Sequence, residues 1–237
     1  MSAGERFVRA FHARRPGITS RAFARGGSYE ELARRVTPGA RVLDLACGDG
    51  PMLAHLPPGA IGVDLSREEL EGVARVVQGR AQALPFATGA FDAVTCHLAF
   101  MLFEEPEAVV AELARVLAPG GTFLAILGGG PVAQPSPGDA FHAFLSALAP
   151  VAPPLGDRRA RTEAGWQQLF AGWDVAPFER WELDLGGTFD DVWSFLASSY
   201  ELDPSAAPAL EGRMRAELRT PLACPVVLWL ARASLRR

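Results

Sequence analysis

The sequence predicts an α/β fold in which a mostly parallel sheet is covered by helices on both faces. Short apolar runs of strand type recur in the first half of the chain, and turns or helical stretches separate them. The first run, Val42–Leu45, leads into a turn of small residues, Ala46–Gly50, and then into residues suited to open a helix. This order of strand, turn and helix is typical of a nucleotide-type site in a βαβ unit.

Composition and charge narrow the class of protein. The 237 residues, 49% of them hydrophobic, suffice for one α/β domain with a large core. No apolar run reaches the roughly 20 residues of a membrane span, and residues 1–15 lack the apolar core of a secretory signal. We therefore expect no membrane partner and a cytoplasmic location. Cys47, Cys96 and Cys224 are too widely spaced for a disulfide framework or a metal site, so no metal is expected.

The arginines are concentrated near the N-terminus. Nine of them, against three acids, precede residue 42, whereas the rest of the chain is acidic. A basic arm can attract an anionic partner. These arginines lack the interleaved aromatic residues that a nucleic-acid surface uses, so no nucleic-acid partner is expected.

Three short helices are expected before the first strand. Apolar residues share one face of a helix over residues 5–15, which Pro16-Gly17 ends. Thr19-Ser20 can cap a second short helix, and Ser28 a third that runs to about Val36.

After these helices, the chain is expected to alternate strands and helices up to about residue 127. A short helix ends at Pro57-Pro58-Gly59, and Ser66 is expected to cap another. Apolar residues on one face predict a longer helix over residues 106–117. The expected strands are residues 41–45, 60–64, 76–79, 88–97 (with its leading turn) and 122–127.

The pattern loosens from Gly128, where glycines and prolines flank one amphipathic helix, Asp139–Leu148. A long irregular stretch in a compact domain is often functional, and we expect a lid at 128–161. The remaining elements expected are helices at 162–170, 190–200 and 210–218, strands at 173–178 and 180–185 (or one bent strand), and a last strand at 226–231.

Acid and small residues alternate after the first strand as Asp44-x-Ala46-x-Gly48-x-Gly50. This resembles motif I of the class I S-adenosylmethionine-dependent methyltransferases, acid-x-Gly-x-Gly-x-Gly, with alanine in place of the first glycine. Phe91–Val94 resembles the F-D-x-V segment of the small-molecule (type 11) subfamily, and Arg115–Phe123 its R-V-L-x-P-G-G-x-F block. The resemblance is detailed over residues 40–127.

The resemblance implies a Rossmann-like, doubly wound sheet of seven strands, mostly parallel with one antiparallel strand, in a single domain. That domain would combine an N-terminal helical cover with lid insertions. Its expected parts are the cover (1–38), a cofactor-binding core (39–127), the lid (128–161) and the C-terminal half of the sheet (162–237) with a helical insertion at 186–221.

S-adenosylmethionine is the cofactor that the resemblance implies, lying across the carboxyl ends of the strands. Asp64 would hold the ribose hydroxyls, Asp44 suits the cofactor's positive charge, and Leu65 and Ala81 would flank adenine. Tyr29 would reach the methionyl end, although a packed aromatic role stays open. The cofactor-binding residues expected are Tyr29, Asp44, Ala46, Gly48, Gly50, Asp64, Leu65, Arg80, Ala81, Gln82 and His97.

One position departs from the family pattern. Arg80–Phe86 resembles the family's D-A-x-x-L-P-F segment, in which the acid receives the adenine amino group, but here that position is Arg80. Either the amide oxygen of Gln82 or a water molecule would then accept the amino proton.

The activity implied is methyl transfer to oxygen or nitrogen of a small-molecule acceptor, such as a natural-product scaffold. His97 follows the fourth strand and is the candidate catalytic base, because an imidazole titrates near neutral pH; a structural hydrogen bond is the alternative. A reaction of the same fold such as cyclisation stays open, and so does a dinucleotide-binding oxidoreductase, although G-x-G-x-x-G is absent. The oligomeric state stays open.

Overall fold

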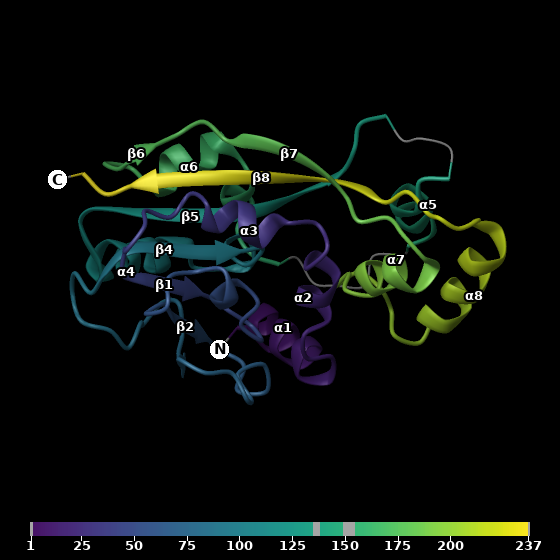
Figure 1. Cartoon of the computed structure of the whole chain (residues 1–237), viewed down its shortest axis with the longest axis horizontal. Helices are drawn as coiled ribbons and strands as arrows, with labels where there is room; N and C mark the ends of the chain where they lie inside the picture. The colour runs from purple at the N-terminus through teal and green to yellow at the C-terminus, as the bar shows by residue number, and fades with distance from the viewer. Residues whose placement is uncertain (1, 135–137, 149–154, 237) are drawn as a thin grey trace.

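A computed structural model describes residues 2–134, 138–148 and 155–236. A single mixed sheet forms its centre, in the order β3-β2-β1-β4-β5-β8-β6, with β7 also paired to β8 (Figure 1). The strands are β1 (Val42–Leu45), β2 (Ile61–Asp64), β3 (Val76–Gln78), β4 (Phe91–His97), β5 (Leu117–Pro131), β6 (Asp174–Val175), β7 (Glu179–Asp184) and β8 (Pro225–Ser234).

The expectation of a mostly parallel sheet with one antiparallel strand is confirmed. β1, β2, β3, β4 and β5 pair in parallel, and β8 runs antiparallel to β5. β6 pairs with the end of β8 at Ala233–Ser234, and β7 pairs with its start at 225–230. The expectation of two strands here is confirmed in preference to one bent strand, and because both pair with β8 the sheet has eight strands where seven were expected.

Helices cover both faces of this sheet (Figure 1). The α-helices are α1 (Ala3–Arg14), α2 (Ile18–Phe23), α3 (Ser28–Ala33), α4 (Pro106–Val116), α5 (Ala140–Ala147), α6 (Glu163–Leu169), α7 (Phe189–Leu196) and α8 (Ala207–Glu217). Three short 3-10 helices join them: η1 (Met52–Ala54), η2 (Phe100–Leu102) and η3 (Arg158–Arg161). Among the helices described, none is long and apolar enough to cross a membrane.

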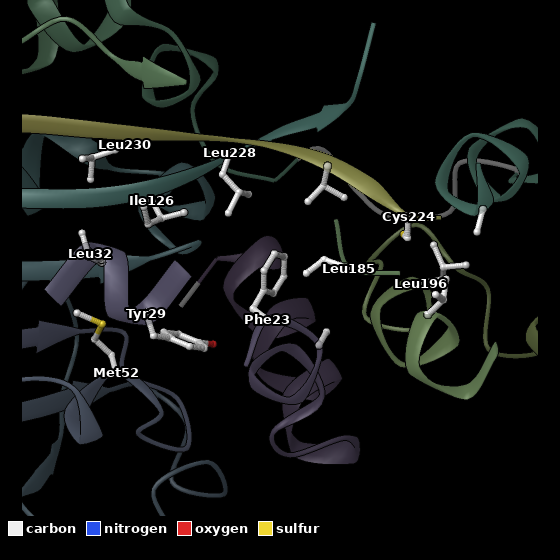
Figure 2. Packing of buried hydrophobic residues seen from close by; sticks show 14 of the residues in the cluster. Phe23, Tyr29, Leu32, Met52, Ile126, Leu185, Leu196, Cys224, Leu228 and Leu230 are labelled. Atoms are coloured by element: carbon white, nitrogen blue, oxygen red, sulfur yellow. The ribbon is translucent and has the colours of Figure 1, made fainter. Parts of the chain in front are cut away.

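The alternation of side chains along the strands produces two separate cores. Val42 of β1 and its partner Ala93 of β4 face α2, α3, α5, α7 and α8. Leu43 and its partner Val94 face α4 and α6 on the other side. In Figure 2 the first core runs from Met52 and Leu32 past Tyr29 and Phe23 to residues near α7.

Three expected helix starts are wrong. No helix follows Ser66: only turns connect β2 to β3, because this short connection contains Gly72 at φ 77° and Arg75 at φ 61°. Gly27 rather than Ser28 caps α3, and the Ser28 hydroxyl bonds to His97 instead. Likewise Gly17, not Thr19-Ser20, precedes α2.

The boundary expected at Gly128 also differs. β5 continues through Gly128 to Pro131, because β8 pairs with it up to that point. α5 is well packed, and Phe144 on it is fully buried. Parts of the expected lid, residues 135–137 and 149–154, lie outside the described residues. The division of the chain into cover, core, lid and C-terminal half remains a prediction.

A capping box at the start of α1 should contribute to the stability of the protein. The Ser2 hydroxyl accepts from the Glu5 backbone N–H, and the Glu5 carboxylate accepts from the Ser2 N–H, which makes a capping box. Ser2→Ala should lower the free energy of unfolding by about 1 kcal/mol. Urea denaturation measures this loss, and an unchanged midpoint would show that α1 does not depend on its cap.

Candidate functional site

A cavity lies at the carboxyl ends of β1, β2 and β4, and residues of α1, α2 and α3 also line it. It encloses about 1260 Å³ with its open mouth included. Ten of the residues expected at the cofactor site line it: Tyr29, Asp44, Ala46, Gly48, Asp64, Leu65, Arg80, Ala81, Gln82 and His97. Gly50 is not among them. We call this space the first cavity.

The turn after β1 is shaped by left-handed backbone. Ala46 has φ 56° and Gly48 φ 54°, conformations that glycine adopts readily and other residues adopt at a cost. Gly50, at φ 80°, has no room for a side chain, because a Cβ there would lie 2.7 Å from a Val73 methyl carbon. Gly50 thus serves the packing of the turn, whereas Gly48 opens its backbone toward the first cavity.

Asp64 is held rigidly at the end of β2. Its Oδ2 accepts from the Gly48 N–H at 2.9 Å, and its Oδ1 accepts from the Ser66 N–H at 2.8 Å. Burial raises the pKa of the Asp64 carboxyl, an effect that these two backbone hydrogen bonds oppose. Each oxygen keeps a further lone pair, so the carboxylate can accept from two hydroxyl groups in the first cavity.

Asp44 presents a buried carboxylate oxygen without a partner. The side chain is 1% exposed, and its Oδ1 accepts from the Thr95 hydroxyl at 2.9 Å. Its Oδ2 is buried and has no hydrogen-bond partner among the described residues. Burial, opposed by the Thr95 hydrogen bond, raises the pKa of Asp44 to about 7. A buried acceptor of this kind is costly unless a ligand donates to it.

His97 is enclosed at the end of β4. Its Nε2 lies 2.9 Å from the Ser28 hydroxyl, and its ring lies against Tyr29 with the ring centroids 4.3 Å apart. Burial lowers the pKa of His97 to about 3. The ring stays neutral near pH 7, but it is a much weaker proton acceptor than an exposed histidine. Its catalytic role remains a prediction.

α1 supplies an acid at the position where the family pattern has lost one. Glu5 Oε1 accepts from Arg80 at 2.6 Å and from the side-chain amide of Gln82 at 3.3 Å. The hydrogen bonds from Ser2 and Arg80, opposed by burial, lower the pKa of Glu5. Because Gln82 donates its NH₂ group to Glu5, its amide oxygen is left to accept from a ligand.

A second polar network crosses the opening of the first cavity. His12 Nδ1 lies 2.8 Å from Glu69 Oε1, and His12 Nε2 lies 2.9 Å from the Tyr200 hydroxyl. The Gly17 N–H donates to the other oxygen of Glu69, which is 5% exposed. Burial raises the pKa of the Tyr200 hydroxyl. The network joins α1, the β2–β3 connection and the segment after α7.

Sequence reasoning missed three of these residues. Glu5 begins the helix expected over residues 5–15, Glu69 lies in the helix expected after Ser66, and Tyr200 ends the helix expected at 190–200, so none of them was expected to line a site. His12 is 188 positions from Tyr200, so no local pattern connects them. The capping box of Ser2 and Glu5 was the one available signal, and it indicates only where α1 begins.

A second, smaller cavity adjoins the first. Thr19, Leu98 and Tyr200 line both. The second cavity encloses about 620 Å³ with its open side included, and its other described lining residues are Phe23, Met101, Gly128, Gly130, Phe141, Phe195, Ser198, Val226, Val227 and Leu228. Among the described residues, no group of three or more potential metal ligands is present.

Comparison with known proteins identifies the region around the first cavity. Residues 43–125, from β1 into β5, match the family model described as a methyltransferase domain. A demethylmenaquinone methyltransferase of Thermus thermophilus is 40% identical over 111 residues, 40% of this chain and 50% of that protein. An uncharacterised methyltransferase of Synechocystis is 37% identical over 106 residues, 40% of this chain and 49% of its own length.

The chain spans about half the length of these curated relatives, and the matched region supplies the sheet side of the first cavity, whereas α1, α2, Tyr29 and Tyr200 lie outside it. Among solved structures, the YcgJ protein of Bacillus subtilis superposes with a TM-score of 0.56 at 22% identity. That superposition covers 89% of this chain and 97% of the other, so the likeness in fold extends well beyond the matched domain.

The left-handed conformation of Ala46 predicts the effect of restoring glycine. Ala46→Gly should stabilise the protein by up to about 1 kcal/mol, because the cost of left-handed backbone outweighs the added freedom of the unfolded chain. Thermal unfolding followed by circular dichroism measures the change. A substitution at Ala54, in the short η1 helix, is the matched control: Ala54→Gly should destabilise instead.

Proposed function

We propose that this chain, a member of the methyltransferase domain family through residues 43–125, uses S-adenosylmethionine to methylate a small molecule. The observation that supports this proposal most directly is the unpartnered Oδ2 of Asp44 in the first cavity. A ligand with a positively charged donor would satisfy that oxygen. A pyrophosphate, the group that a dinucleotide would bring to this turn, would be repelled by it.

The other residues of the first cavity suit the same ligand. The Asp64 carboxylate, oriented by Gly48 and Ser66, would hold the two ribose hydroxyls. Ala81 and Leu65 line the adjoining wall, where a flat base would lie. The Gln82 amide oxygen, left unused by the hydrogen bond to Glu5, would accept from the base's amino group. The departure at Arg80 is then compensated by Glu5, which pairs with Arg80 and orients Gln82.

When bound, S-adenosylmethionine supplies a methyl group on a positively charged sulfur. The chain's task is to align an acceptor with that methyl and to keep water away, and such alignment lowers barriers by up to about 7–11 kcal/mol. Side chains of α1 and α2 cover the first cavity and so limit the access of water. The adjoining second cavity provides space for the acceptor, which we propose is methylated on oxygen or nitrogen.

Asp64 should contribute strongly to cofactor affinity. Asp64→Asn removes the charge and one acceptor oxygen, and a hydrogen bond to a charged group is worth about 1.5–3 kcal/mol. Isothermal calorimetry with S-adenosylhomocysteine should show a dissociation constant raised about ten- to a hundredfold. Glu68→Gln is the matched control, since this acid lies in the same connection and does not line the cavity. Equal affinities of wild type and Asp64→Asn would contradict the assignment.

Asp44 should make cofactor binding depend on pH. With a pKa raised to about 7, its carboxyl is increasingly protonated as the pH falls from 7.5 to 5.5 and then no longer attracts an ammonium group. The dissociation constant of S-adenosylhomocysteine should rise on the order of tenfold over this interval.

The neighbouring Asp64 also has a raised pKa, so a variant must isolate Asp44. Asp44→Asn should bind more weakly at pH 7.5 and should lose most of the pH dependence. If the dissociation constant depends on pH in Asp44→Asn as it does in the wild type, then Asp64 or another group causes the pH dependence and Asp44 does not.

Turnover separates methyl transfer from the alternative activities. Incubation with S-adenosylmethionine labelled in its methyl group and a metabolite extract should transfer label to a small molecule, with one S-adenosylhomocysteine formed for each transfer. A cyclisation would consume an acceptor without forming S-adenosylhomocysteine. Binding of NAD without binding of S-adenosylhomocysteine would support the oxidoreductase alternative.

A further inference from the structure

The described wall of the second cavity is apolar and uncharged. Its aromatic and aliphatic side chains come from α2, α5, α7, β8 and the start of η2, and the polar side chains among them are three hydroxyls: Thr19, Ser198 and Tyr200. No described lining residue carries a charge. A charged ligand would lose its hydration there without gaining a partner, which is costly. The chemistry of this wall selects an uncharged, apolar molecule.

Tyr200 lies at the junction of the two cavities. It lines both of them, as do Thr19 and Leu98. Its ring packs edge-on against Phe11, with the ring centroids 4.8 Å apart, so its position is set by α1. The Ser198 hydroxyl, by contrast, already donates to the Phe195 carbonyl at 2.6 Å. Thr19 also lines both cavities, but of the three hydroxyls it is Tyr200 that is hydrogen-bonded to a histidine, so Tyr200 is the one best placed to take a proton from a molecule in the second cavity.

The Tyr200 hydroxyl is connected to a proton acceptor. His12 Nε2 lies 2.9 Å away, and on the other side of the ring His12 Nδ1 lies 2.8 Å from the Glu69 carboxylate. The Glu69 carboxylate favours the tautomer with the proton on Nδ1, which leaves Nε2 free to accept from Tyr200. A positive charge formed on His12 would be stabilised by Glu69. His97, whose pKa is lowered by burial, is hydrogen-bonded to the Ser28 hydroxyl rather than to a carboxylate.

We propose that the second cavity is the methyl-acceptor site and that it takes an uncharged, apolar molecule bearing a hydroxyl group. Tyr200 accepts a hydrogen bond from that hydroxyl, and His12, itself bonded to Glu69, accepts from Tyr200. This inference rests on the proposed function and names the acceptor class and the residue that contacts it. Tyr200 is the catalytic residue; His12 and Glu69 are positioning residues.

The transfer balances with these groups alone. The acceptor oxygen forms a bond to the methyl carbon while its proton passes to Tyr200 Oη, and the proton of Tyr200 passes to His12 Nε2. The bond between methyl and sulfur breaks, and its electron pair neutralises the sulfur. The products are a methyl ether, a neutral thioether and a protonated His12 beside Glu69. Tyr200 relays the proton without standing ionised, which its raised pKa would oppose.

A binding experiment tests the contact with Tyr200. In the presence of S-adenosylhomocysteine, dissociation constants are measured by calorimetry for 2-naphthol and for 2-methylnaphthalene, which has a methyl in place of the hydroxyl. Tyr200→Phe keeps the ring against Phe11 and deletes only the hydroxyl. In this variant the affinity for 2-naphthol, relative to that for 2-methylnaphthalene, should fall about three- to tenfold.

Ser198→Ala is the matched control for this ratio, because its hydroxyl is already donated to a backbone carbonyl. The ratio should stay the same in this variant. 2-Naphthoate, an anion of the same shape, should bind at least about tenfold more weakly than 2-naphthol. An unchanged ratio in Tyr200→Phe, a shift in Ser198→Ala instead, or tighter binding of 2-naphthoate would each overturn the proposal.

Transfer to 2-naphthol tests the proton route. The wild-type protein with S-adenosylmethionine should form 2-methoxynaphthalene, and both Tyr200→Phe and His12→Gln should lower the rate at saturation about a hundredfold. His12→Gln should leave the dissociation constant of 2-naphthol within about threefold, so the loss falls on kcat rather than KM. No product from the wild type, or a loss confined to His97→Ala, would overturn the proposal.

Binding of S-adenosylhomocysteine, measured in the same samples, separates the two hypotheses. If the wild-type protein does not bind it, the proposed function fails. If every variant binds it and the naphthol results still go against Tyr200, the inference about the acceptor fails alone. Retained binding also shows that Tyr200→Phe and His12→Gln have folded.

Discussion

A buried carboxylate at the end of the central strand organises this site. Asp44 pairs in register with Thr95 of β4, and the Thr95 hydroxyl satisfies one of its oxygens, while the other has no hydrogen-bond partner in the part of the chain that the structure describes. Keeping such an oxygen buried costs on the order of 1–3 kcal/mol. Parallel strands bring Asp44, Asp64 and His97 to the same edge of the sheet, and the turn after β1 leaves that edge open. The cavity is the consequence of that arrangement.

The N-terminal cover belongs to the site as much as the sheet does. Glu5 of α1 pairs with Arg80, and His12 of the same helix bonds to Glu69 and Tyr200. Glu5 and His12 lie about two helical turns apart on one face of α1, and Glu5, Val8, Arg9 and His12 all line the first cavity. Hydrogen bonds therefore join α1 to the β2–β3 connection, to the segment after β3 and to the segment after α7.

The two cavities differ in chemistry in a way that suits two different ligands. The first is lined by five carboxylates, Glu5, Asp44, Asp49, Asp64 and Glu69, which favours a ligand rich in donors and positive charge. The described wall of the second has no charge and is mostly aromatic and aliphatic. Tyr200 lines both cavities, and its hydroxyl is hydrogen-bonded to His12, which lines the first. The proposed transfer from a cationic donor to an apolar acceptor would use that division.

Local sequence determined most of the sheet and the main residues of the first cavity. Short apolar runs predict the strands, and Asp44, Gly48 and Asp64 fall at or just after strand ends, where backbone geometry brings them together. Tertiary structure decided which groups those residues meet. The Ser28 hydroxyl bonds to His97, 69 positions away, instead of capping α3, and burial lowers the pKa of that histidine. Arg80 meets Glu5 and Tyr200 meets His12 across separations of 75 and 188 residues. Periodicity and turn chemistry act over a few residues, whereas side-chain pairing and burial depend on the packing of the whole chain, which no local pattern records.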